Sequence, residues 1–114
     1  MKHSELNLVH KPLVAHIRTR LVPGVVWHHS PNGGWRDARQ GALFKHMGTR
    51  AGWPDLEFLA GGEFFGLELK APKGRPTESQ LETLDAIRNA GGHGVVAEGL
   101  DEAIRCLSFW GLIK

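Results

Sequence analysis

Two carboxylates and a lysine stand at the ends of two neighbouring apolar segments. Asp55 comes directly before the apolar run 56–60. Glu68 and Lys70 end the next apolar run, 64–70. Residues two apart in a strand share a face, so Glu68 and Lys70 should point the same way. A hairpin between the two runs would place Asp55 beside Glu68, and the spacing therefore predicts that two carboxylates and an ammonium group meet at one place.

This combination of groups suits metal-assisted chemistry. Two carboxylates can hold a hard cation such as Mg²⁺, which prefers oxygen ligands and keeps several waters. A lysine beside such a cation can position or deprotonate a metal-activated water. Each group also has an ordinary alternative, because Pro54-Asp55 fits a turn and Glu68 could simply pair with Lys70. An ion pair within one strand, however, does not explain the second acid before the neighbouring strand.

A helix should precede these strands. Apolar residues recur at helical spacing from Leu6 to Leu21, and Ser4 is expected to be the N-cap. Pro12 interrupts this pattern, since proline lacks a backbone donor and clashes with the preceding turn. We therefore expect either a kink at Pro12 or a second helix that has Pro12 in its first turn.

Strands and helices alternate along the rest of the chain. We expect strands at 25–29, 56–60, 64–70 and 93–97, and helices at 37–47, at 77–90 and from an Asp101 cap onward. The order is α-β-(α)-β-β-α-β-α, without a repeat or a linker. A strand, a helix and a strand in succession form a crossover unit, so the sheet should be mixed. The sequence predicts an α/β fold in which helices flank a mixed β-sheet.

Two segments of the chain extend the pattern around these residues. The first, 48–55, reads Gly-x-x-x-Gly-Trp-Pro-Asp. The second, 68–80, contains Glu-x-Lys, then Lys-x-Pro-x-x-Arg, and ends at Gln80. These segments, and the order of elements over the whole chain, resemble the VRR-NUC family, the virus-type replication-repair nucleases of the PD-(D/E)XK superfamily. The resemblance implies a restriction-endonuclease-like fold and metal-dependent cleavage of DNA phosphodiester bonds.

The resemblance also implies roles for individual residues. Asp55, Glu68 and the backbone carbonyl of Leu69 would bind Mg²⁺ or Mn²⁺. Glu5 is the candidate for the acidic residue that the family carries on its first helix, although the glutamine found a turn later is absent here. A glutamate at a helix start could equally complement the helix dipole.

Lys70 would be the catalytic lysine, and Gln80 would hold the attacking water or a phosphate oxygen. Gln80 also fits a capping box with Thr77, and the two roles are expected to combine poorly in one rotamer. Basic residues around the site would contact DNA phosphates and give a salt-sensitive affinity. They are Arg36, Arg50, Lys73 and Arg75.

Composition sets further limits. The 114 residues carry a net charge of +2 and 41% hydrophobic residues, which predicts one compact domain over 1–114 with a small core. The single cysteine, Cys106, excludes an internal disulfide and should be a buried, inert thiol. The chain shows no signal peptide and no long apolar run, so we expect a cytoplasmic protein without membrane association or an organic cofactor.

Seven histidines raise the possibility of a zinc site. The adjacent His28 and His29 should point to opposite faces of a strand, and no Cys-x-x-Cys or His-x-x-x-His pair accompanies them. The spacing therefore argues against structural zinc. His29 and Asn32 are expected to line the DNA groove instead.

The resemblance implies a partner and an assembly. Stand-alone members are phage or bacterial proteins that resemble Holliday-junction resolvases, so we expect a homodimer acting on branched DNA. The candidate interface residues are Leu13, Ile17, Trp110 and Ile113, in a chain that also carries Trp27, Trp35 and Trp53. The alternative is a DNA-binding scaffold with a vestigial site, although such a module has no use for clustered acids facing phosphate.

Overall fold

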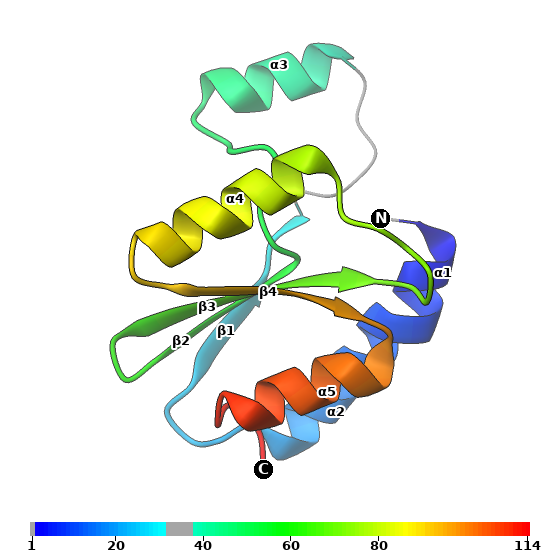
Figure 1. Cartoon of the computed structure of the whole chain (residues 1–114), viewed down its shortest axis with the longest axis vertical. Coiled ribbons are helices and arrows are strands. Elements are labelled where there is room, and N and C mark those ends of the chain that lie inside the picture. The colour runs from blue at the N-terminus through cyan, green and yellow to red at the C-terminus, as the bar shows by residue number, and fades with distance from the viewer. Residues whose placement is uncertain (1, 32–37) are drawn as a thin grey trace.

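The computed structural model describes residues 2–31 and 38–114. Their helices and strands follow the predicted order, α-β-(α)-β-β-α-β-α (Figure 1). The elements are α1 (His3–Glu5), the π-helical turn η1 (Leu6–His10), α2 (Lys11–Arg20), β1 (Val26–His29), α3 (Ala38–His46), β2 (Leu56–Ala60), β3 (Glu63–Lys70), α4 (Glu78–Asn89), β4 (His93–Glu98) and α5 (Leu100–Phe109).

The four strands form one mixed sheet in the order β1-β2-β3-β4. β1 pairs with β2 and β2 with β3 in antiparallel fashion, whereas β3 and β4 are parallel. The parallel pair is joined through α4, which confirms the predicted crossover unit. In Figure 1, α4 lies on one face of the sheet, and α2 and α5 lie on the other.

The N-terminal helical segment resolves the question raised by Pro12. The π-helical turn η1 separates α1 from α2, and the N–H of Lys11 donates to the carbonyl of Leu6, five residues earlier. Pro12 lies in the first turn of α2, so the second of the two alternatives is correct. The wide turn accommodates a residue that cannot donate a helical hydrogen bond. Ser4 lies inside α1 and Lys2 is the N-cap, so the prediction of a Ser4 cap was wrong.

The hairpin of β2 and β3 has a tight turn at Gly61 and Gly62. Ala60 pairs with Glu63, and both central glycines have positive φ, at 58° and 80°. Turns with two such residues match the twist of a hairpin and favour glycine at both positions. The register also pairs Leu56 with Leu67. One further step along the same register brings Asp55 opposite Glu68, as predicted.

The core lies between the sheet and the helices α2 and α5. Its fully buried side chains come from η1, α2, β2, β3 and α5 and include Val9, Leu13, Ile17, Leu56, Phe58, Leu67 and Leu107. Leu13 and Ile17 are 0% exposed and Ile113 is 5% exposed. These three residues cannot form an interface with a second copy, so that part of the prediction was wrong. Trp110 is half-buried and its ring lies 5.2 Å from that of Phe65.

Helix α5 departs from expectation in two details. Gly99 is its N-cap, and Asp101 lies in the first turn, where its charge complements the helix dipole. Cys106 is only half-buried. Burial, followed by the nearby Glu102 carboxylate, nevertheless raises the pKa of the Cys106 thiol to about 11, so the thiol stays protonated at neutral pH. Across residues 2–31 and 38–114, every helix is too short or too polar to cross a membrane.

Candidate active site

Asp55 is fixed at the start of β2. Its side chain is buried, and its Oδ2 accepts a 2.8 Å hydrogen bond from the backbone N–H of Leu69. The N–H and C=O of one strand residue point to the same side, so the carbonyl of Leu69 faces the same side as Asp55. The strands β2 and β3 therefore bring together two of the oxygen donors predicted from the sequence, the Asp55 carboxylate and the Leu69 carbonyl.

Glu68 lies opposite Asp55 and is only 2% exposed. Its Oε2 accepts a 2.9 Å hydrogen bond from Nε2 of Gln80 and lies 3.5 Å from Nζ of Lys70. Its Oε1 is buried and has no hydrogen-bond partner among the described residues. Burial and then the Asp55 carboxylate raise the pKa of Glu68 to about 8, against the opposing effect of Lys70. The carboxyl group of Glu68 therefore keeps its proton to a higher pH than an exposed glutamate does.

Lys70 connects β3 to the N-terminal helix. Its Nζ lies 3.5 Å from Oε1 of Glu5, the same distance as from Glu68. The Glu5 side chain is buried, and its Oε2 accepts a 3.1 Å hydrogen bond from the backbone N–H of Lys2. The structure therefore brings Glu5 to the site, and the same side chain also satisfies the start of the helix.

Gln80 performs two structural tasks in one rotamer. Its Oε1 accepts a 2.8 Å hydrogen bond from the N–H of Thr77, which completes the capping box of α4. Its Nε2 donates to Glu68 at 2.9 Å. Capping and a contact with Glu68 therefore coexist in one rotamer, and the role of Gln80 in holding the water or a phosphate oxygen stays a prediction. An amide has an acceptor end and a donor end, and the two ends face different partners here.

The residues that meet here fit a hard cation. No group of three or more His, Cys, Asp or Glu side chains in the described parts of the chain is arranged to hold a metal ion. The donors at the site are two carboxylates and a backbone carbonyl, and Mg²⁺ commonly combines one or two carboxylates with several waters. A cation between Asp55 and Glu68 would also give the unpartnered Oε1 of Glu68 a ligand role.

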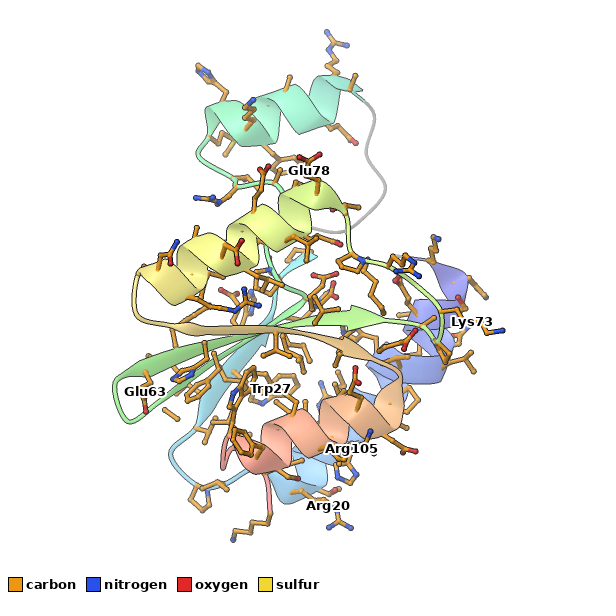
Figure 2. The ribbon with its side chains drawn as sticks, in the orientation of Figure 1. Arg20, Trp27, Glu63, Lys73, Glu78 and Arg105 are labelled. Carbon is orange, nitrogen blue, oxygen red and sulfur yellow. The ribbon has the colours of Figure 1, made fainter. Side chains whose placement is uncertain are left out.

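The four basic residues predicted to bind DNA differ in their surroundings. Lys73 and Arg75 are exposed on the loop that follows β3, and Figure 2 shows Lys73 extending outward from it. Arg50 donates from Nε to the hydroxyl of Thr83 at 3.2 Å, so it also holds the loop before β2 against α4. Arg36 lies outside the described residues, as do Asn32 and Trp35.

Two histidines next to the site have contacts that the sequence did not predict. The Nδ1 atom of His29 lies 2.9 Å from the backbone carbonyl oxygen of Asp55, within hydrogen-bond distance. The ring of His10 meets that of His29 edge-on, with 4.5 Å between centroids. His10 is 6% exposed. Its position three residues before the buried Leu13 was the available signal, since it places His10 on the inner face of the helix.

Gly52, in the loop before Asp55, is predicted to be irreplaceable. Its φ is +76°, and an added Cβ would collide with the backbone of Ser79 at the start of α4. Gly52→Ala should lower the free energy of unfolding by more than about 2 kcal/mol, measured by urea denaturation. Gly48→Ala is the matched control, because Gly48 has a φ of +98° with open space around it. Equal losses in the two variants would contradict the close contact with α4.

Comparison with known proteins supports the predicted family. No protein-family model and no curated protein matches the chain. Among solved structures, a VRR_NUC domain protein superimposes with a TM-score of 0.73 and 25% sequence identity, and the match covers 96% of this chain and 89% of that chain. The order of elements, the mixed sheet and this superposition agree, and the chain has the fold of the VRR-NUC family.

Proposed function

We propose that this protein is a metal-dependent deoxyribonuclease. The observation that carries the proposal is the meeting of Asp55, Glu68 and Lys70, with one oxygen of Glu68 left buried and unpartnered. Two acids held together in a buried place cost stability unless a proton or a cation lies between them. The structural likeness to a VRR_NUC domain protein supports the same activity.

The described residues suggest a division of labour. Asp55, Glu68 and the Leu69 carbonyl would hold Mg²⁺ or Mn²⁺, with Glu5 as a further candidate ligand. Such a cation lowers the pKa of a bound water and neutralises charge on the phosphate. Lys70, placed between Glu5 and Glu68, would orient the attacking water.

Gln80 would keep the Glu68 carboxylate in position and hold the water or a phosphate oxygen. Lys73 and Arg75 are the exposed phosphate contacts, and Arg36 and Arg50 complete the proposed set. From the family resemblance we add a preference for branched DNA and a role in phage or bacterial replication and repair, in the cytoplasm.

A panel of labelled DNAs tests the activity. Purified protein is incubated with duplex, nicked, flap and four-way-junction DNA in Mn²⁺, and the cuts are mapped. We expect cleavage in Mn²⁺ or Mg²⁺, none in EDTA, and the fastest cleavage on branched forms. Binding of all the DNAs without a cut in either metal would support the alternative, an inactive DNA-binding scaffold.

Metal binding should depend steeply on pH. Below a pKa of about 8, Glu68 carries a proton that the cation must displace. The apparent affinity for Mn²⁺ should therefore rise about tenfold per pH unit from pH 6 to pH 8 and then level off. Calorimetry across this range measures it, and a flat profile would contradict the role of Glu68.

The same pKa shift makes the metal-free protein less stable as the pH rises, whereas metal affinity increases. The pKa of Glu68 is raised from 4.5 to about 8 in the folded state, so the folded protein holds the proton more tightly. This stabilisation is complete below pH 4.5 and is lost as the pH rises through about 8. Glu68→Gln should remove both pH dependences.

We retain a homodimer in the proposal, because two sites could then act on two strands of one branched DNA. It must use a surface that excludes the buried Leu13, Ile17 and Ile113. Light scattering should report twice the monomer mass at about 50 µM, a concentration that reveals moderate affinity. A monomer mass there would contradict the dimer and leave the nuclease proposal standing.

A further inference from the structure

A basic groove lies on the side of the chain where α2 faces β1. It has a volume of about 540 Å³, within the range of small-ligand sites. One wall comes from the end of η1 and from α2, and the other comes from β1. The lining residues are His10, Lys11, Val14, Ala15, Arg18, Trp27, His28 and His29.

The charges in this groove are of one sign. Its titratable groups are histidine, lysine and arginine side chains, and no carboxylate stands among the lining residues that the structure describes. Lys11 and Arg18 are exposed, and neither side chain makes a hydrogen bond or an ion pair within residues 2–31 and 38–114. They are seven residues apart, so they share a face of α2 with about 10 Å between them along the axis. The groove therefore presents two uncompensated cations to a ligand.

The groove also offers flat ring surface on its β1 wall, across from the cations of α2. Trp27 is half-buried and stacks on Phe58, with ring centroids 6.3 Å apart, which fixes the plane of the indole. His29 is fixed beside it by its contact with the Asp55 carbonyl. Cations on one wall and rigid rings on the other match a nucleotide, whose phosphate needs charge and whose base needs a stacking surface. An acidic peptide would use the charges and leave the rings without a role.

The groove is connected to the candidate active site through its innermost residues. His29 contacts the backbone of Asp55, and the ring of His10 packs on that of His29. His10 is buried, and its Nδ1 has no hydrogen-bond partner among the described residues. The groove thus adjoins the edge strand β1 on the face of the sheet that carries α2, whereas Glu68 contacts Gln80 of α4 on the other face (Figure 1).

We propose that the groove between α2 and β1 binds one nucleotide of a DNA strand that passes the β1 edge of the sheet. Lys11 and Arg18 hold its phosphate, and the rings of Trp27 and His29 contact its base. The inference rests on the proposed nuclease function for the identity of its ligand. Its test, however, requires neither metal nor cleavage.

The test is binding of thymidine monophosphate to the full chain in EDTA, followed by NMR of the indole N–H signals. Trp27→Phe assigns the Trp27 signal. We expect that signal to shift and to saturate in the millimolar range, with thymidine or inorganic phosphate at least about tenfold weaker because each supplies half of the contacts. Shifts confined to the other indoles would overturn the proposal, as would equally tight binding of hexaglutamate.

A pair of double variants separates the groove from general charge. Lys11→Gln with Arg18→Gln should weaken nucleotide binding at least about tenfold, because two charge-assisted contacts are lost. Arg20→Gln with Lys114→Gln removes the same charge from exposed positions outside the groove, and Figure 2 shows Arg20 pointing away from the body of the protein. This control should bind as the wild type does. Equal affinities in the two variants would overturn the proposal.

Single-stranded DNA provides the second readout. For an oligothymidylate in EDTA, the groove variant should reduce the salt dependence of log affinity by about 0.7, because the contact with one phosphate is lost. The control should leave the slope unchanged. Nucleotide binding in the groove without DNA cleavage in Mn²⁺ would reject the nuclease function and support the groove as a nucleotide site. DNA cleavage in Mn²⁺, with nucleotide binding unchanged in the groove variant, would reject the groove as a nucleotide site and support the nuclease function.

Discussion

Replacing Lys70 by alanine is expected to slow DNA cleavage by at least about 100-fold at saturating Mn²⁺. The Lys70 ammonium lies 3.5 Å from both Glu5 and Glu68, where it can reach a water bound near these carboxylates. Alanine removes this charge and donor without adding bulk. Single-turnover kinetics on the best substrate of the DNA panel measures the loss.

Two controls keep this result interpretable. Lys73→Ala removes an exposed lysine from the loop after β3 and should change the cleavage rate only through DNA affinity. Calorimetry should show that Lys70→Ala still binds Mn²⁺, because the proposed ligands are intact. A Lys70→Ala protein that is folded, binds Mn²⁺ and cuts at the wild-type rate would show that Lys70 has no catalytic role.

Asp55→Asn is expected to lose DNA cleavage for a different reason, because the metal should no longer bind. Asparagine is nearly the same size and its amide oxygen can still accept from the N–H of Leu69, so the strand ends should stay in place. The negative charge is gone, however, and Mn²⁺ affinity should fall by about 100-fold or more. The pKa of Glu68 should also fall, because the Asp55 charge is one cause of its rise.

Calorimetric titration with Mn²⁺ measures this effect. Asp85→Asn is the matched control, since Asp85 is an exposed acid on α4 that pairs with Arg88 at 2.7 Å. Its removal should leave Mn²⁺ affinity unchanged. Unaltered Mn²⁺ affinity in Asp55→Asn would place the metal elsewhere on the protein.

The centre of the site could be predicted because its geometry is local. The glycine pair at the hairpin tip fixes the register of β2 and β3, and the register fixes which residues face each other. From that information alone, Asp55 and Glu68 had to meet, and Lys70 had to share the face of Glu68. The capping box that begins α4 was equally visible in the spacing of Thr77 and Gln80.

The remainder depends on contacts between distant segments. An apolar stripe on a helix indicates that the stripe is buried but does not identify the surface that buries it. Leu13 and Ile17 were therefore predicted to contact a second copy, whereas α5 and the sheet of the same chain enclose them. The contact of Glu5 with Lys70 requires the N-terminal helix to reach the end of β3, which no local spacing encodes. The position of His10 beside His29 depends on the π-helical turn that the sequence did not predict.

Anomalous diffraction from crystals grown with Mn²⁺ is the most direct test of the central claim. The account predicts a strong peak between the carboxylates of Asp55 and Glu68, with metal–oxygen distances of about 2.2 Å and the Leu69 carbonyl nearby. It also predicts that the peak disappears in Asp55→Asn crystals grown in the same way. A fully occupied peak on His10, His28 or His29, with none between Asp55 and Glu68, would contradict the account.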